Sequence, residues 1–165
     1  MTDSATRSGN ANAVVTVYGE TSPYGGNAYA KYITKKVVLT PGNDSGDLRV
    51  FYTAYKPAGT EVYIYYKILN ASDTSKFEDQ NWQLATQVSN TGVYSQNRTN
   101  LIEYEWAPGK LNKADNQISY TSTNGQTYHN FIQFAIKVVM ATADNTTVPF
   151  LTDIRALALP SGTGI

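Results

Sequence analysis

A candidate pair of acid–base residues lies in the segment Leu101–Trp106. Glu103 and Glu105 stand two residues apart, so a β-strand would carry both on one face and apolar side chains on the other. A glycoside hydrolase instead needs two carboxylates that face each other across a cleft. Neighbouring carboxylates on one strand more often form a solvated surface, so this pair predicts a polar face rather than a catalytic site.

The segment Asn43–Asp47 gathers oxygen ligands around a glycine, as a calcium loop does. It lacks the ligand spacing and the terminal glutamate of an EF-hand, and such residues also build turns without a metal. His129 is the single histidine, and a lone histidine before a long strand caps or packs more often than it catalyses. The sequence holds no nucleophile elbow, phosphate-binding loop or dinucleotide fingerprint. We therefore expect no catalytic residue, no metal and no cofactor, and a protein that is not an enzyme.

The composition excludes several further classes of function. Thirteen Lys and Arg residues balance thirteen Asp and Glu residues among 165, which removes the electrostatic footprint of a general nucleic-acid binder. The absence of cysteine excludes disulfides and thiol chemistry. No segment approaches the roughly 18 apolar residues that a membrane span needs. We therefore expect no membrane insertion, and from the charge balance we expect no binding of nucleic acid.

Two segments show the period-two alternation of β-strands. In 61–69 the apolar row consists of Val62, Ile64, Tyr66 and Ile68, and in 130–140 it runs from Ile132 to Met140. Weaker candidates cover the ranges 13–18, 28–39, 47–55, 81–88, 99–107 and 150–159, and a short helical connector is expected near 73–80. About eight strands predict an all-β fold, with two antiparallel sheets packed as a jelly-roll-like β-sandwich.

The division of the chain follows from these patterns. Residues 28–160 are expected to form one sandwich domain, and 161–165 a C-terminal tail. Residues 1–27 are expected to form an N-terminal arm that orders only against a partner, because they are rich in glycine and polar residues.

Aromatic side chains on the strands are the candidate contact residues. Rows of exposed rings on a sandwich stack on sugars or fill protein interfaces, although the same rings can line the core between the sheets. The alternation also places Lys137 on the outer face, where its substitution would cost little stability unless that face docks a partner. The candidate interface or glycan contacts are Tyr63, Tyr65, Trp82, Tyr94, Tyr128 and Lys137.

Several stretches together resemble a β-domain of virion structural proteins from contractile-tailed phages, most closely cyanobacterial myoviruses. The resemblance lies in the order of the elements over roughly residues 30–159: "DLRVFYTAYKPAGTEVYIYYKIL", then "FEDQNWQ", then "FIQFAIKVVM" and "DIRALAL". No single motif is diagnostic, and related sandwiches occur in adhesins and carbohydrate-binding domains.

The resemblance implies a non-enzymatic structural protein of the phage tail or baseplate, located in the virion and assembled in the host cytoplasm. Its partners would be other virion proteins, in a homo-oligomeric or multi-copy arrangement. The alternative is a carbohydrate-binding module of a tail appendage that adsorbs to a host surface glycan. In such phage proteins the domain often ends a longer chain, so this sequence is either a small stand-alone virion protein or part of a longer one.

Overall fold

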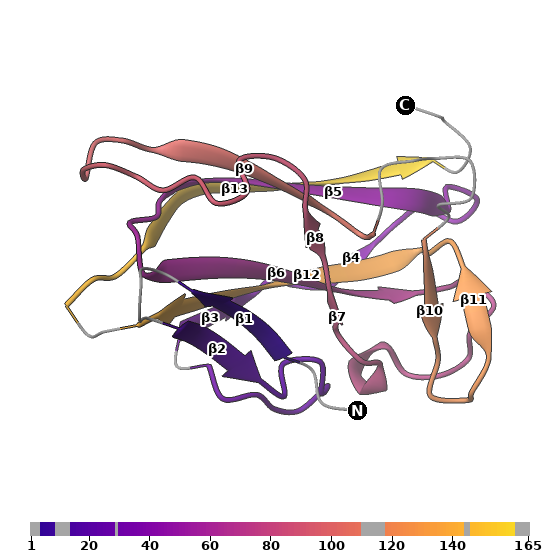
Figure 1. Cartoon of the computed structure of the whole chain (residues 1–165). Helices are drawn as coiled ribbons and strands as arrows, with labels where there is room; N and C mark the ends of the chain where they lie inside the picture. Colours follow the sequence, from indigo (N-terminus) through magenta and orange to yellow (C-terminus); the bar gives the residue numbers. More distant parts are fainter. Residues whose placement is uncertain (1–3, 9–13, 29, 110–117, 144–145, 161–165) are drawn as a thin grey trace.

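The computed structural model describes residues 4–8, 14–28, 30–109, 118–143 and 146–160, and the fold is all-β (Figure 1). Every strand pairing in the described residues is antiparallel. The elements are β1 (Ser4–Ser8), β2 (Val14–Tyr18), β3 (Ala30–Ile33), β4 (Val37–Val38), β5 (Ser45–Tyr55), β6 (Thr60–Leu69), a 3-10 turn η1 (Phe77–Asp79), β7 (Gln83–Leu84), β8 (Thr86–Gln87), β9 (Ile102–Ala107), β10 (Ser119–Thr121), β11 (Thr127–His129), β12 (Gln133–Thr142) and β13 (Phe150–Pro160).

Two sheets face each other as the layers of a sandwich (Figure 1). One has the order β3-β12-β6-β7, with β4 pairing β12 beyond the end of β3, and the other has the order β13-β5-β9-β8. Two separate ribbons, β1-β2 and β10-β11, accompany the sheets. The prediction of an antiparallel, two-sheet fold is confirmed. The strand orders do not establish the jelly-roll connectivity, which stays a prediction.

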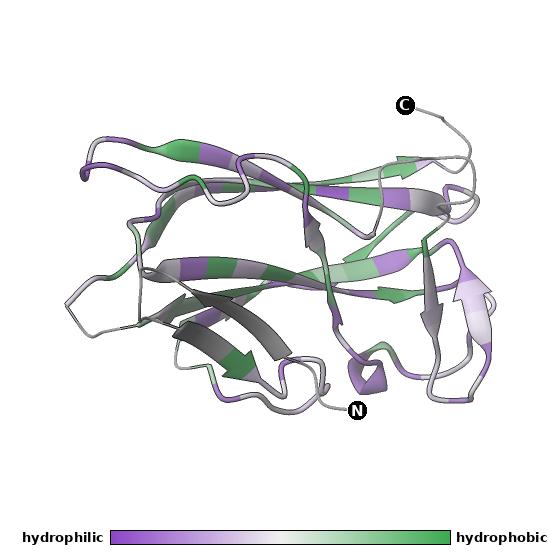
Figure 2. Cartoon of the chain, in the orientation of Figure 1, coloured by the Kyte–Doolittle hydropathy of each residue, from purple (hydrophilic) through white to green (hydrophobic). Residues whose placement is uncertain are grey.

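The two strongest alternating segments form the centre of the first sheet. Strands β6 and β12 pair in unbroken register from Gln133 opposite Leu69 to Thr142 opposite Thr60. Ile64, Ile136 and Val138 belong to the hydrophobic core, which also takes in the inward residues of β5 and β9. Figure 2 shows apolar residues recurring along both facing layers. Alternation thus buries one side of each strand between the sheets, as expected for a sandwich.

The segment expected as one strand at 81–88 is divided between the two sheets. Strand β7 pairs with β6 and β8 pairs with β9, and only Ala85 separates them. The amide of Ala85 donates to the carbonyl oxygen of Ile64 at 2.9 Å, so the chain stays hydrogen-bonded while it changes layer. This crossover closes one side of the sandwich. The opposite side is formed by β3 and β4 in one sheet and β13 in the other.

The N-terminal segment differs from the expectation of a free arm. Strand β2 pairs with β1, Val17 lies in the core, and Glu20 is fully buried. The amide of Trp82 donates to the carbonyl oxygen of Thr21 at 2.9 Å, which ties this segment to the β6–β7 connection. Residues 17–28 therefore pack against the chain's own first sheet. The tail 161–165 lies outside the described residues.

Candidate functional site

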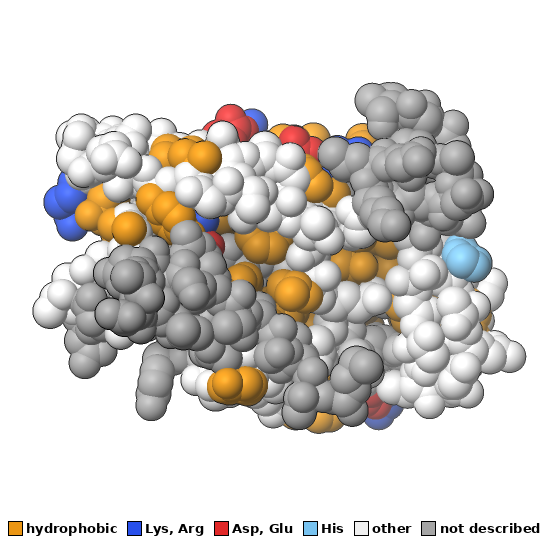
Figure 3. All heavy atoms as spheres, viewed as in Figure 1, with side chains coloured by type: hydrophobic (Ala, Val, Ile, Leu, Met, Phe, Trp, Pro, Cys, Tyr) orange, Lys and Arg blue, Asp and Glu red, His pale blue; other side chains and the backbone are white. Residues whose placement is uncertain are grey.

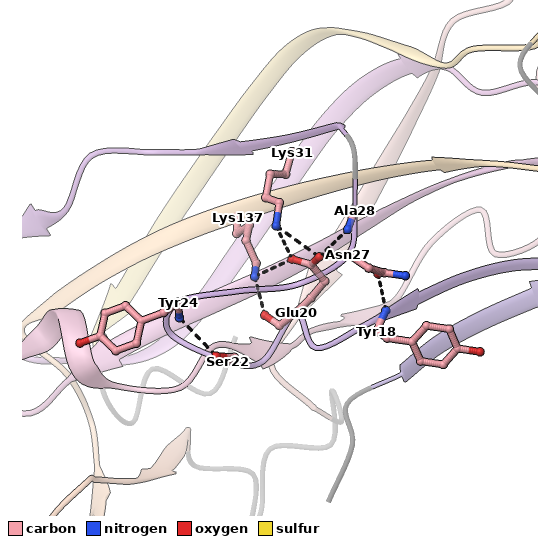
Figure 4. A network of polar contacts seen from close by, with 8 residues as sticks. All are labelled: Tyr18, Glu20, Ser22, Tyr24, Asn27, Ala28, Lys31 and Lys137. Carbon is pink, nitrogen blue, oxygen red and sulfur yellow. Dashed lines mark hydrogen bonds and ion pairs between the residues drawn. The ribbon is translucent and has the colours of Figure 1, made fainter.

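The side of the first sheet that faces away from the second sheet carries an ionic cluster, which is buried under the N-terminal segment. Lys137 of β12 lies directly opposite Tyr65 of β6 and points toward the loop that follows β2 (Figure 4). Its Nζ lies 3.0 Å from Glu20 Oε1 and also donates to the Glu20 carbonyl oxygen. Lys31 Nζ lies 3.2 Å from the same carboxylate oxygen, so two ammonium groups share one carboxylate.

A tight loop between β2 and β3 positions the Glu20 carboxylate. The backbone amide of Tyr18 donates to Asn27 Oδ1 at 2.7 Å, and the amide of Ala28 donates to Glu20 Oε2 at 2.9 Å (Figure 4). Gly26 has φ +120°, and a Cβ at this position would overlap the Glu20 carboxylate. Glycine is needed here both for its backbone conformation and for the space that it leaves.

Aromatic rings surround the lysines of this cluster. Lys137 Nζ lies 5.1 Å from the centroid of Trp82 and 5.0 Å from that of Tyr65. Lys67, on the same face, lies 4.7 Å from Trp82 and donates to the carbonyl oxygen of Glu78 at 3.1 Å. Burial lowers the pKa of Lys67, and the nearby charge of Lys137 lowers it further. Ring faces favour cations, so the cluster replaces part of the water that these ammonium groups lose.

These contacts correct the expectation for Tyr63, Tyr65, Trp82 and Lys137. All four are buried, with Lys137 only 1% exposed, so they are not surface contacts for a sugar or a partner. The alternation placed Lys137 on the correct side of its strand, but residues 17–28 cover that side. Tyr63 packs edge-on against Trp106 of the second sheet, with ring centroids 6.4 Å apart. These side chains stabilise the fold.

The two remaining candidate rings are half-buried and hydrogen-bonded within the chain. Tyr94 donates its hydroxyl to Glu61 Oε2 at 2.6 Å, beside the buried Lys56. The hydroxyl of Tyr128 donates to Gln126 Oε1 at 2.8 Å and accepts from Asn124 Nδ2. Its ring stacks on the buried Tyr120, at 5.7 Å between centroids. Neither ring stands free as a stacking platform.

The carboxylates of β9 lie on the solvent side of the second sheet, as expected. Glu105 accepts from Arg49 Nη1 at 2.8 Å, and Glu103 pairs with Arg155 of β13. On the other face Tyr104 and Trp106 are buried. Glu105 is thus bound by an arginine of the neighbouring strand β5 and Glu103 by an arginine of β13, one strand further away, and the two side chains do not face each other across a cleft.

The oxygen-rich segment 43–47 forms a turn and the start of β5. Asn43 donates its amide to the carbonyl oxygen of Thr40, and Asp47 Oδ2 lies 3.1 Å from Arg49 Nε. His129 is exposed and ends β11. Within the described residues no three His, Cys, Asp or Glu side chains gather as metal ligands, and no helix is long and apolar enough to cross a membrane.

Exposed apolar side chains concentrate on the side of the sandwich opposite the β7–β8 crossover. Eleven large apolar residues are exposed in the described part of the chain, and five of them belong to β3, β4 and β13: Tyr32, Ile33, Val37, Val38 and Leu157. Figure 3 shows the crossover side, where apolar side chains also reach the surface in several places among polar side chains and backbone. We call the side formed by β3, β4 and β13 the open side. Tyr32 and Val37 lie opposite the core residues Val138 and Phe134, whereas Leu157 lies opposite Arg49 on the solvent face of the second sheet.

Comparison of the sequence with protein-family models and curated proteins, and of the fold with solved structures, gives no match. Both the buried clusters and the open side could be found only from the structure. The sequence signal for it is weak, because the apolar pairs Tyr32–Ile33 and Val37–Val38 have the pattern of ordinary strand residues.

The buried carboxylates predict that acid destabilises the fold. Burial alone would raise the pKa of Glu20, but the Ala28 amide, Lys137 and Lys31 outweigh it and hold the pKa below its ordinary value of 4.5. A lowered pKa means that the folded state binds the proton more weakly than the unfolded state. The stabilisation is therefore complete above pH 4.5 and is lost as the pH falls through the lower folded-state pKa.

We expect the midpoint of thermal unfolding to stay level from pH 7 to about pH 5 and to fall below that range. Glu20→Gln should lower the midpoint at pH 7 and flatten its acid dependence, because the titrating group is gone. Asp73 contributes in the same direction, since hydrogen bonds from Tyr120, Ser122 and Ser75 outweigh its burial and lower its pKa. A midpoint that rises toward pH 4 would contradict this assignment.

Proposed function

We propose that this chain is a non-enzymatic structural protein of a contractile-tailed phage, placed in the tail or baseplate and acting through contacts with other virion proteins. The proposal rests on the order of the sequence elements, from 47–69 through 77–83 to 131–140 and 153–159. These four stretches correspond to β5 and β6, to η1 with Trp82, to β12, and to the regular part of β13.

The distribution of polar groups supports a role in assembly rather than in chemistry. Glu20, Glu61, Lys56 and Lys137 are buried in ion pairs within the chain. The strand carboxylates Glu103 and Glu105 are neutralised by arginines. A virion component needs a stable fold and specific interfaces, and apolar surface on the open side offers such an interface.

The carbohydrate-binding alternative is weakened by the geometry. It requires exposed, coplanar rings, whereas Trp82 is buried beside Lys67 and Lys137. Tyr128 stacks on a buried neighbour rather than on a second exposed ring. We therefore place protein–protein contact before glycan binding.

Mass spectrometry of purified phage particles tests the proposal directly. We expect peptides of this chain in particles at a stoichiometry of several copies, and we expect them to remain after the particles are washed in high salt. Absence of the chain from intact particles would overturn the proposal. Binding on a glycan array at millimolar concentration or below would instead favour the carbohydrate-binding alternative.

A further inference from the structure

We propose that the open side of the sandwich is a self-association surface, on which a second copy of this chain docks so that β13 pairs with β13 of its partner. The inference concerns two copies of the purified chain and does not depend on the proposed virion function. Antiparallel pairing of edge strands is an established mode of protein association, because an edge strand presents unpaired backbone donors and acceptors.

Strand β13 has the properties of an edge that can pair. In the described residues it pairs with β5 alone, and from Asp153 to Leu159 the register is unbroken. This run, Asp153-Ile-Arg-Ala-Leu-Ala-Leu159, contains no glycine or proline, and Leu157 is 50% exposed. A long edge strand of this kind is normally covered, paired or protected by charged side chains.

The charges on β13 are self-complementary. Asp153 and Arg155 point to the solvent face, about half exposed, and Arg155 Nε lies 3.1 Å from Asp153 Oδ2 within the chain. Antiparallel pairing about a two-fold axis at Ile154 sets residue 153 of one copy opposite residue 155 of the other. Each Asp153 then meets the partner's Arg155, on both sides of the axis. Opposite charges facing each other across paired strands are favourable, and like charges are unfavourable.

The same axis brings a second layer into contact. Because Asp153 and Arg155 lie on the same face in both copies, the axis runs perpendicular to the sheet. The β3 and β4 edges of the two first sheets are then brought toward each other beneath the paired β13 strands. Tyr32 lies opposite Val138 and Val37 opposite Phe134 in the register of the first sheet. Their partners on β12 are buried, whereas Tyr32 and Val37 are exposed where the sandwich ends.

A second copy fits this side better than a charged partner does. The exposed residues of β3 and β4 are apolar, with Lys35 and Lys36 exposed in the segment between them, and on β13 Asp153 and Arg155 carry opposite charges, Arg155 also pairing with Glu103. A two-fold interface requires a surface that is complementary to itself. Pairing at Ile154 meets this requirement, and it would bury apolar side chains of both sheets together.

Charge exchange on purified protein tests the proposed register. We expect the parent chain to dimerise in sedimentation velocity over a concentration series from about 1 µM to about 1 mM. Asp153→Arg sets a second guanidinium against the partner's Arg155, and Arg155→Asp sets a second carboxylate against the partner's Asp153. Each single variant should dimerise at least about tenfold more weakly than the parent, because two like-charge contacts replace two attractive ones.

Mixing the two variants supplies the decisive measurement. A D153R chain paired with an R155D chain restores both opposite-charge contacts, so the mixture should form heterodimers with at least the parent's affinity. The double variant D153R/R155D should also regain self-association. Circular dichroism should show that every variant is folded, because exposed ion pairs contribute little to the stability of a fold.

Two further variants complete the test. Lys76→Asp reverses an exposed charge just before η1 and should leave dimerisation unchanged. Val38→Lys places a charge on the β4 edge and should weaken dimerisation, because the edges of both sheets take part in the proposed interface. A parent chain that stays monomeric to about 1 mM would overturn the proposal. Single reversals without effect, or a mixture that does not associate, would overturn the register and with it the proposed interface.

Discussion

Replacing Lys137 with methionine is expected to lower the free energy of unfolding by about 3–5 kcal/mol, the usual cost of removing one partner of a buried ion pair. Methionine approximates the length of the lysine stem but supplies no charge and no donor. Glu20 is fully buried and would lose the partner at 3.0 Å that also binds its carbonyl oxygen. Lys31 still contacts the carboxylate, so we expect a value toward the lower end of that range.

The residues whose hydrogen exchange accelerates distinguish the loss of this ion pair from a general loss of core packing. Hydrogen exchange in K137M should accelerate first in residues 17–28, because Lys137 holds their loop through Glu20. The amide of Ala28, which donates to Glu20, is the most direct reporter. Urea unfolding followed by tryptophan fluorescence measures the global effect, since Trp82 lies beside Lys137.

Two further variants test whether the loss in K137M comes from the buried ion pair. Lys36→Met removes an ammonium group from an exposed pair with Glu78 at 3.4 Å and should cost less than about 1 kcal/mol. The double variant E20Q/K137M should recover part of the loss of K137M, because neither charge is then buried without its partner. If K137M unfolds at the same urea concentration as K36M, the ion pair does not hold the N-terminal segment.

The alternating strands could be predicted from the sequence because their pattern is local. The segments 61–69 and 130–140 carry the period-two signal, and they form β6 and β12 as neighbours at the centre of a sheet. The short connector near 73–80 contains η1, as expected. The ribbon β10–β11 was not anticipated, because two three-residue strands around Gly125 carry too few residues to show a period.

What covers each face of a strand could not be predicted, since the covering residues are distant in the sequence. Lys137 lies on the face that alternation assigns to it, but the residue that binds it is 117 positions earlier. Every residue of β6 is buried, although its alternation alone predicts one exposed face. The candidate contacts failed for this reason: Tyr63, Tyr65 and Trp82 lie under or between segments that the local pattern cannot place there.

The open side shows the converse case, in which apolar strand residues stay exposed. Tyr32 and Val37 have the sequence context of core residues, and their pairing with Val138 and Phe134 agrees with that assignment. They are exposed because β3 and β4 end the sheet and no further strand of the described chain lies beyond them. Only the strand order reveals that these residues and Leu157 of β13 belong to the same side.

Truncating Phe134 to alanine is expected to cost about 3–5 kcal/mol, from lost transfer energy and from the cavity that remains. Phe134 is buried near the start of the central strand β12, opposite Ile68, and its ring lies edge-on to Phe131 at 5.8 Å between centroids. Both rings belong to the single hydrophobic core. A domain of this size has roughly 5–15 kcal/mol of stability in total, so the loss is a large fraction of it.

A conservative variant and a surface variant serve as controls for this prediction. Phe134→Leu keeps most of the volume and should cost clearly less than Phe134→Ala, because a smaller cavity remains. Val38 lies on the exposed edge next to Val37, the residue that pairs with Phe134. Val38→Ala should therefore change the monomer's stability by less than about 0.5 kcal/mol. Chemical unfolding of all three variants at a concentration where the chain is monomeric separates core packing from association. An F134A chain that unfolds at the parent's urea midpoint would mean that this side of β12 does not face the core.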